Sequence, residues 1–264
     1  MCFTRNHLRY LVAATAIIAA QTPALAAEEE VEVYTGYQVA KGELDLSLHM
    51  NYVTTGEPGG EFSGGETTTH RLRITPEFSY GLGGGFEVAT YLPLITIAPD
   101  NVVRAQGVIG RIQWIRPKKD PYGFFWGGNL ELGRLSSQID ENPWHGEAKA
   151  IAGWKNRRWT AAVNPTVGFV IDGPVAAPAT FALNSKIAFN VTPKLAVGIE
   201  SYNGTGAISD AVHFRTSEQS SYAVVDAPVG KWFVHAGVGI GYGGNRDHAI
   251  AVLSLGIPLP HLRH

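Results

Sequence analysis

Apolar and polar residues alternate along most of the chain that follows residue 41. In residues 43–52, Leu44, Leu46 and Leu48 share one face, while Asp45 and His49 lie on the other. A period of two residues indicates a β-strand with one apolar and one polar face. The pattern predicts twelve strands, over residues 43–52, 71–80, 86–94, 103–116, 124–135, 147–154, 159–171, 179–191, 195–202, 219–227, 232–241 and 248–257.

The links between these strands differ in length in a regular way. After the second strand, every second link is short, as in "GLGGG", "PKKDPY", "KNRR", "TPK" and "PVGK". The links between them are mostly longer, and include "TTGEPGGEFSGGETTTH" and "NGTGAISDAVHFRTSE". Short turns at one end and long loops at the other are typical of transmembrane barrels, which have an even number of strands. We therefore predict an all-β fold, a closed antiparallel barrel over residues 42–264 with periplasmic turns and extracellular loops.

Five of the six tryptophans border the short turns. They are Trp114, Trp126, Trp154, Trp159 and Trp232. Indole rings prefer the lipid headgroup layer, where the ring is partly apolar and its N–H stays in contact with water. We expect these residues to form an aromatic girdle, and Trp144, Tyr52 and Tyr222 to form a second ring near the long loops. A soluble barrel whose aromatic residues close its ends is the alternative.

The opposite face of the predicted strands is polar and often charged. We expect ten of its residues to line the lumen: Arg71, Arg73, Glu77, Glu87, Glu131, Glu147, Lys149, Lys186, Glu200 and His235. Side chains fill the interior of a barrel of about eight strands, whereas porins of sixteen strands leave an aqueous channel. A barrel of about twelve strands has an interior of intermediate width. These residues would either line a narrow aqueous path or close it by pairing with one another.

Pro76, Pro93 and Pro165 fall inside predicted strands. Proline has no N–H to donate within a sheet, so each position should coincide with a bulge or a break in pairing.

The first 26 residues have the pattern of a secretory signal peptide. Arg5 and Arg9 precede an apolar stretch, and Ala24-Leu25-Ala26 forms an A-x-A cleavage site. Residues 27–41 would then be an N-terminal periplasmic segment. Cleavage removes Cys2 and leaves 19 basic and 23 acidic residues, a formal charge of −4. This acidity disfavours a nucleic-acid partner, and the lack of cysteine in the mature chain excludes a disulfide framework.

Catalytic and metal-binding motifs are not evident. Outer-membrane phospholipases with twelve strands carry an H-x-S-N-G type pattern, whereas His49 here lies in "SLHMNYV". The remaining histidines are scattered without the paired spacing of metal ligands. We therefore expect no enzymatic activity, no metal and no cofactor, although an outer-membrane lipid hydrolase remains an alternative.

The stretch "PEFSYGLGGGFEVATYLPLIT" carries a family resemblance. A strand ends in Tyr80-Gly81-Leu82, turns tightly, and returns through alternating residues to Leu92-Pro93. This hairpin resembles the outer-membrane barrels of the "MetA pathway of phenol degradation" family, and "NVTPKLAVGIESYNG" has a similar shape. The resemblance implies a barrel in the Gram-negative outer membrane that takes up small solutes, including aromatic or hydrophobic compounds. It identifies no catalytic or binding residue.

The expected partners follow from this interpretation. They are outer-membrane lipids, a small-molecule solute, and the barrel-assembly machinery during insertion. A structural or partner-binding barrel with a closed lumen is the main alternative to solute passage.

Overall fold

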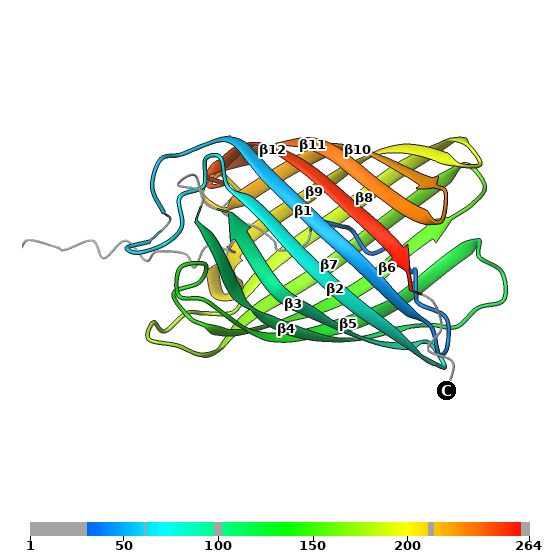
Figure 1. The fold of residues 1–264 in the computed structure, drawn as a ribbon, viewed down its shortest axis with the longest axis horizontal. Coiled ribbons are helices and arrows are strands. Elements are labelled where there is room, and N and C mark those ends of the chain that lie inside the picture. The colour runs from blue at the N-terminus through cyan, green and yellow to red at the C-terminus, as the bar shows by residue number, and fades with distance from the viewer. Residues whose placement is uncertain (1–30, 61, 98–101, 211–213, 260–264) are drawn as a thin grey trace, which may run out of the picture.

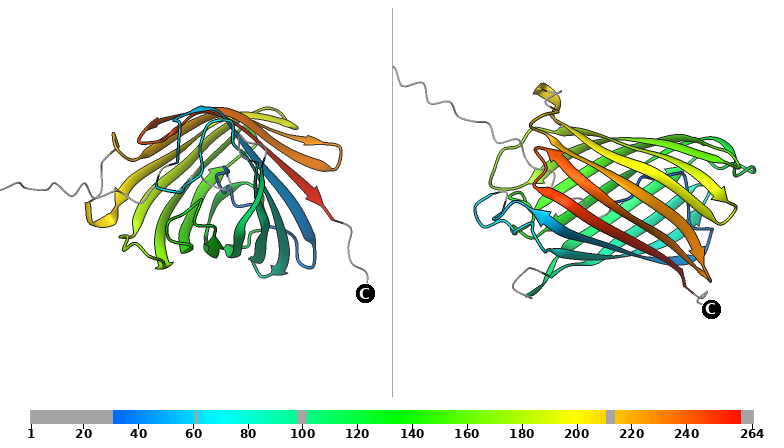
Figure 2. Two further views of the ribbon diagram at one scale, coloured as in Figure 1. Left: turned by 60° about the vertical axis from the view of Figure 1, so that its left-hand side comes forward. Right: turned by 90° about the horizontal axis from the view of Figure 1, so that it is seen from above.

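The computed structural model describes residues 31–60, 62–97, 102–210 and 214–259. In this part of the chain, twelve antiparallel strands form a closed barrel (Figures 1 and 2). They are β1 (Leu44–Gly56), β2 (Leu72–Gly83), β3 (Phe86–Ile97), β4 (Val103–Ile115), β5 (Gly123–Leu135), β6 (Trp144–Lys155), β7 (Trp159–Asp172), β8 (Thr180–Thr192), β9 (Leu195–Ala207), β10 (Glu218–Val229), β11 (Trp232–Gly243) and β12 (Asp247–Pro258). The predicted fold class is confirmed, and every predicted strand overlaps an observed one.

Each strand pairs with its neighbour in the sequence, and the ring closes between β1 and β12. This last pairing runs from Asp45 opposite Pro258 to Gly56 opposite Asp247. Closure leaves no strand with a free edge. In a bilayer a free edge is unfavourable, because each unpaired backbone group in hydrocarbon costs on the order of several kcal/mol.

The two ends of the barrel differ as the link lengths predict. Tight turns at 84–85, 156–158, 193–194 and 230–231 and the longer turn 116–122 lie at the end that bears the C-terminus in Figure 1. Longer links lie at the other end, including 57–71, 136–143 and 208–217, the last of which begins with the 3-10 helix η1 (Ile208–Asp210). We refer to these as the short-turn end and the long-loop end.

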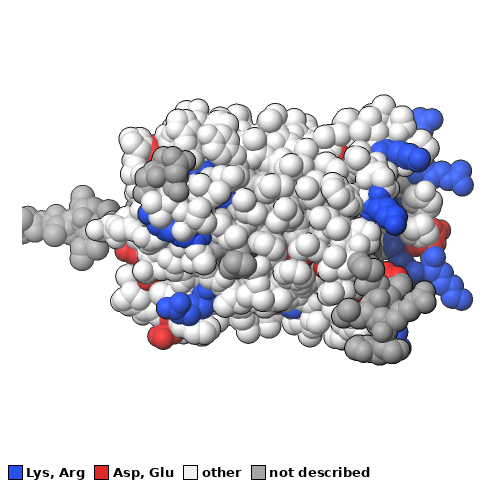
Figure 3. Space-filling model, in the orientation of Figure 1, with Lys and Arg blue, Asp and Glu red and all other residues white. Residues whose placement is uncertain are grey.

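The outer surface is apolar. Large side chains such as Ile187, Ile199 and Val238 are 60–66% exposed on the barrel exterior. In Figure 3 the middle of the barrel shows hardly any charged side chains, while Lys and Arg gather at the short-turn end. Leu46, on the predicted apolar face of β1, and Val234 of β11 are only half-buried. No helix among the described residues is long and apolar enough to cross a membrane.

The tryptophans of the predicted girdle lie on this outer surface. Trp126, Trp154, Trp159 and Trp232 are exposed. Trp114 is half-buried because its ring packs edge-on against Trp126, with ring centroids 5.2 Å apart.

The predicted second ring of aromatic residues is observed only in part. Tyr52 and Trp144 are exposed near the long-loop end. Tyr222 is a correction, because its side chain points inward, is only 4% exposed, and packs against Tyr202. Tyrosine fits either face of such a wall, since it has an apolar ring and a polar hydroxyl.

The prolines within strands coincide with irregular pairing. The β2–β3 register shifts between Ile74 and Glu77, across Pro76, and the β3–β4 register shifts between Tyr91 and Leu94, across Pro93. Pro165 pairs with Leu183 of β8, but the β6–β7 ladder has no pair at its position. The missing N–H donors therefore fall where the ladders are interrupted.

The segment of residues 31–41 lies inside the barrel and not in the periplasm as expected from the sequence (Figure 2). Val33 is 1% exposed and belongs to an apolar cluster with Ile151, Ala162 and Tyr222 from the wall. The apolar residues of the segment are thus removed from water in the lumen, as they would not be in the periplasm. Residues 1–30, which include the predicted signal peptide, lie outside the described residues. We refer to residues 31–41 as the lumen segment.

Candidate functional site

The ten residues expected to line the lumen all lie on the inner side of the barrel wall. Seven of them are at most 6% exposed: Arg71, Arg73, Glu77, Glu87, Lys186, Glu200 and His235. Glu131, Glu147 and Lys149 are half-buried. Contacts between strands that are not neighbours, described below, establish that these side chains point toward the barrel axis.

The first cluster is centred on Arg111 of β4. The Arg111 Nη2 donates to Glu87 Oε1 at 2.8 Å and to Glu77 Oε1 at 2.5 Å. Its Nη1 donates to the hydroxyl of Tyr91 at 2.9 Å. His49 Nε2 lies 2.9 Å from the second oxygen of Glu77. One guanidinium therefore joins two carboxylates of β2 and β3, which uses the planar fork geometry of arginine.

The second cluster lies on the opposite wall, on β8 to β11. Lys186 Nζ lies 2.9 Å from Glu200 Oε1 and 2.8 Å from Asp226 Oδ2. His235 Nδ1 lies 2.6 Å from Asp226 Oδ1. Tyr202 donates its hydroxyl proton to Glu200 at 2.7 Å. This cluster connects four consecutive strands and pairs its cation with carboxylates, as buried charges require.

Further ion pairs lie near the long loops. Arg71 Nη2 contacts Asp247 Oδ2 at 2.8 Å, and Arg73 Nη2 contacts Glu66 Oε2 at 3.2 Å. Glu66 also accepts a hydrogen bond from the amide of Gln106. Arg71 and Arg73 lie on the same face of β2 as Glu77, but the two arginines bind carboxylates nearer the long loops, while Glu77 binds Arg111.

Tyr34 of the lumen segment occupies a site built from several strands. Its hydroxyl is bonded by Arg111 Nη1 and lies 3.3 Å from both Tyr91 and Glu131. Lys149 Nζ lies 4.8 Å from the centre of the Tyr34 ring, and the Arg111 guanidinium lies 5.2 Å from it. Cations at these distances are attracted to the ring face.

The rest of the lumen segment is held by side chains near the short-turn end. Val39 N donates to Glu87 Oε2 at 2.7 Å, and Gln113 donates to the carbonyl of Tyr37 at 3.2 Å. Lys41 forms a single parallel bridge with Gly81 of β2. The segment is thus anchored to the wall mainly by side-chain hydrogen bonds and apolar packing, and it forms no strand of the barrel.

Several residues of this site were not predicted from the sequence. The alternation in 103–116 places Arg111 on the polar face, but nothing in the sequence marks it as the centre of a cluster. Alternation likewise indicates only that Asn164 lies on the polar face, and Tyr34 and Tyr91 carry no such signal, since the contacts of these residues join parts of the chain far apart in the sequence.

The lumen is polar, and each of its two clusters places one Lys or Arg against two carboxylates. No group of three or more His, Cys, Asp or Glu residues suited to a metal ion occurs among the described residues. The lumen segment narrows the space between these two clusters.

Comparisons with known proteins find similarity at the level of the fold. No protein-family model and no curated protein matches the chain. Among solved structures, the "COG4313 outer membrane channel from Pseudomonas putida F1" has a TM-score of 0.59 and 10% sequence identity, over 87% of this chain and 100% of that chain. The "KdgM porin" has a TM-score of 0.54 and 10% identity, over 82% of this chain and 99% of that chain.

A second KdgM structure, "in complex with disordered oligogalacturonate", has a TM-score of 0.51 and 11% identity over 83% of this chain and 99% of that chain. At these identities the likeness concerns the fold and not the solute. The chain therefore has the fold of outer-membrane β-barrel channels.

Proposed function

We propose that this protein is a channel of the Gram-negative outer membrane that gives passive passage to small solutes. One observation carries the proposal: a closed barrel with an apolar exterior has a polar lumen that is narrowed by a segment of the chain that is not one of the strands of the wall. The likeness to outer-membrane channels supports it. Its partners in this role are outer-membrane lipids, the solute, and the barrel-assembly machinery that inserts it.

The lumen segment is the constriction in this proposal. It takes no place in the sheet, and the pairing of β1 with β12 that closes the wall does not involve it. Its displacement would leave the paired charges of the Arg111 and Lys186 clusters along a wider path. Pores of this kind select by diameter and by the placement of charged groups.

The proposal extends to hydroxylated aromatic solutes. The site of Tyr34 holds a phenol ring close to two cations and places three polar groups at its hydroxyl. A free phenolic solute would meet the same contacts once the segment has moved. The hairpin around Tyr80 and Leu82, which resembles the MetA pathway family, supports the same refinement, and we propose membership of that family on these residues.

Liposome swelling and planar-bilayer conductance test the channel proposal. We expect small neutral solutes to enter liposomes that contain the protein, and faster when residues 27–41 are deleted. Equal and negligible rates for the full chain and the deletion variant, with a heat-modifiable barrel in both, would favour a structural barrel with a closed lumen.

The aromatic refinement has its own test. The Tyr34→Ala variant removes the phenol ring from its site and leaves the surrounding groups in place. We expect added phenol to reduce the conductance of this variant more than that of the wild type. Equal effects of phenol and cyclohexanol would contradict the refinement, because only phenol provides a π face for Lys149 and Arg111.

The proposal includes no enzymatic activity. Assay of lipid hydrolysis in detergent, with a phospholipase of the outer membrane as positive control, tests this part. Release of fatty acid by the purified barrel would favour the lipid-hydrolase alternative.

A further inference from the structure

The short-turn end of the barrel has an excess of basic side chains (Figure 3). Seven of them lie in the turns between β4 and β5, β6 and β7, β8 and β9, and β10 and β11: Arg116, Lys118, Lys119, Arg157, Arg158, Lys194 and Lys231. All seven are exposed, and Asp120 is the only acidic residue of these turns. Lys41 and Glu43, which precede β1, offset each other in formal charge. We refer to the seven residues as the basic collar.

The charge of the basic collar is not neutralised within the described part of the chain. None of the seven residues forms an ion pair with another described residue. Lys118 Nζ donates to the carbonyl of Tyr122 at 3.2 Å, and Asp120 Oδ1 accepts the N–H of Tyr122 at 2.8 Å. The basic collar is therefore a surface on which an anion gains cations that no carboxylate of the protein already occupies.

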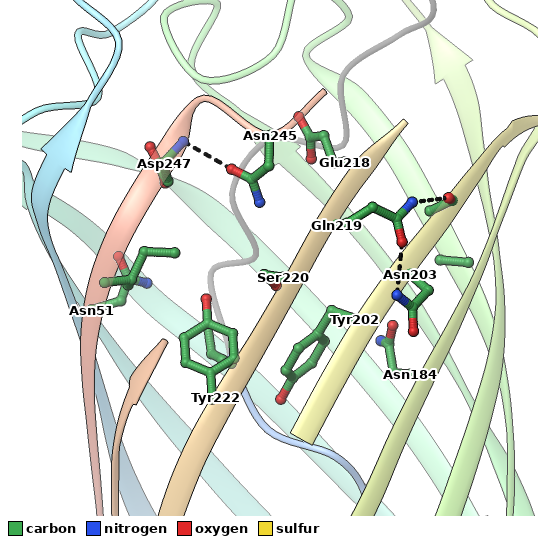
Figure 4. Close-up of a pocket in the computed structure, with 14 residues that line it drawn as sticks. Asn51, Asn184, Tyr202, Asn203, Glu218, Gln219, Ser220, Tyr222, Asn245 and Asp247 are labelled. Carbon is green, nitrogen blue, oxygen red and sulfur yellow. Dashed lines mark hydrogen bonds between the residues drawn. The ribbon is translucent and has the colours of Figure 1, made fainter. Parts of the chain in front are cut away.

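Polar groups near the long loops are instead bonded to one another. Arg246 Nη1 contacts Glu57 Oε2 at 3.1 Å. Asn203 Nδ2 donates to Gln219 Oε1 at 2.7 Å (Figure 4). The unpaired positive charge is thus a feature of the short-turn end.

The turn between β6 and β7 shows how two arginines of the basic collar are positioned. Asn156 Oδ1 accepts the N–H groups of Arg158 and Trp159, each at 2.7 Å. From β8, Asn190 N donates to the Arg158 carbonyl at 2.8 Å and Asn190 Nδ2 donates to the Arg157 carbonyl at 2.9 Å. These bonds hold the backbone of the turn and leave both guanidinium groups exposed.

The basic collar lies directly beside the tryptophan girdle. Arg158 precedes Trp159 at the start of β7, and Lys231 precedes Trp232 at the start of β11. Trp159 is exposed and packs against Phe189, with ring centroids 4.9 Å apart. Indoles of such a girdle lie at the level of the lipid headgroups. The neighbouring basic side chains, on the turn side of the indoles, therefore lie where the phosphate groups of the leaflet are.

Phosphate is the anion that this surface fits. The planar fork of arginine binds phosphate oxygens in pairs, and lysine binds them as a point charge. A zwitterionic headgroup brings its own cation, which the basic collar repels, whereas an anionic headgroup does not. The turns that carry the collar extend from β4 to β11 around the rim of the closed wall. A shell of lipids surrounds the rim in the same way.

We propose that the basic collar binds the phosphate groups of anionic phospholipids in the leaflet at the short-turn end. Such binding would fix the depth of the barrel in the bilayer together with the tryptophan girdle. The proposal rests on the membrane location of the barrel and does not depend on solute passage.

The test uses the full chain in phosphatidylcholine vesicles, with Trp144→Phe as the common background. This change removes the exposed tryptophan near the long loops, so the remaining fluorescence comes from the girdle. Phosphatidylglycerol and phosphatidylcholine with brominated acyl chains quench the tryptophans that they contact, and the two quenching curves give the relative binding constant of the lipids. We expect phosphatidylglycerol to bind about fivefold more strongly at low salt. The preference should decline at ~1 M salt, where the Debye length is about 3 Å.

A double variant, Arg157→Gln with Arg158→Gln, tests the collar itself. Its hydrogen bonds to Asn156 and Asn190 involve the backbone and are kept, while two cations are lost. We expect the preference for phosphatidylglycerol to fall to about half of its original value.

The matched control is Arg134→Gln with Arg215→Gln. It removes the same charge from two exposed residues at the long-loop end, and we expect it to keep the original preference. Heat modifiability establishes that each variant is a folded barrel.

Three results would overturn the proposal. Equal quenching by the two lipids would leave the basic collar to an acidic protein of the periplasm. An unchanged preference in the Arg157 and Arg158 variant would show that the collar does not bind the lipid. An equal decline in both double variants would show that net charge alone attracts it. Any of these results obtained with a barrel that still admits solutes to liposomes would leave the proposed channel function in place.

Discussion

Asn164 binds both backbone groups of Tyr34. The Tyr34 N–H donates to Asn164 Oδ1 at 2.7 Å, and Asn164 Nδ2 donates to the Tyr34 carbonyl at 3.2 Å. Asn164 is fully buried on β7. One side chain of the wall thus replaces the two ladder hydrogen bonds that Tyr34 would make in a sheet. It holds the lumen segment at Tyr34.

Asn164→Ala should loosen the lumen segment. The variant removes both hydrogen bonds and leaves two buried backbone groups of Tyr34 without them, at a cost of about 1–3 kcal/mol. We expect openings of the channel to become about tenfold more frequent in planar-bilayer recordings. Asn190→Ala, at the short-turn end of the barrel, is the control and should show the wild-type frequency. Unchanged gating in Asn164→Ala would mean that this contact does not hold the channel closed.

Gly36→Ala should displace the segment for a steric reason. Gly36 has φ +75°, and a Cβ there would lie 2.6 Å from an atom of the Phe125 ring. Gly42→Ala is a matched control, because Gly42 has φ +79° but nothing within 4 Å of an added Cβ. Both variants incur the left-handed strain of roughly 1–2 kcal/mol, and only Gly36→Ala adds the clash. We expect a higher conductance for Gly36→Ala than for Gly42→Ala, and equal conductances would contradict the packing of Gly36 on Phe125.

Arg111→Met should destabilise the barrel. It leaves the buried carboxylates of Glu77 and Glu87 without the guanidinium between them, and loss of one partner of a buried ion pair costs about 3–5 kcal/mol. Urea unfolding in detergent measures the change. Arg158→Met, in the exposed turn 156–158, should change the free energy of unfolding by less than about 0.5 kcal/mol.

Arg111→Lys should restore only part of this stability. Lysine keeps the charge but lacks the planar fork that reaches Glu77, Glu87 and Tyr91 together. Stability of Arg111→Lys equal to the wild type would show that charge alone is needed at this position.

A charge on the outer surface should be tolerated according to its depth. Ile187 lies near the middle of β8 and is 60% exposed, whereas Val229 ends β10 beside a short turn and is 57% exposed. In a bilayer, Ile187→Arg should cost about 2–4 kcal/mol and Val229→Arg about 0–1 kcal/mol. Refolding into liposomes at graded denaturant measures both. Equal costs for the two variants would argue against the outer-membrane location.

Most of the fold could be predicted from the sequence, because strand alternation is a local property. Leu46 and His49 differ in polarity according to their faces, and the wall that β1 forms places them on opposite sides. The position of the tryptophans beside short turns likewise follows from local sequence. The face of Tyr222 was not predictable in this way, since tyrosine is compatible with lipid headgroups and with a polar lumen alike.

The candidate site could be predicted only as a set of inward positions. Alternation places Glu77, Glu87 and Lys186 on the polar face, but it does not say which carboxylate pairs with which cation. Those pairings depend on the curvature of the closed wall and on the register of strands that meet across the lumen.

The sequence by itself determined a closed barrel with an apolar exterior, a polar interior and two unlike ends, because each of these depends on residues that are neighbours in the chain or across a tight turn. Only the tertiary structure decided that residues 31–41 enter the lumen and that Tyr34 binds Arg111 and Asn164. The physical reason is that these contacts join residues up to 130 positions apart, and they form only after the wall has closed around the segment.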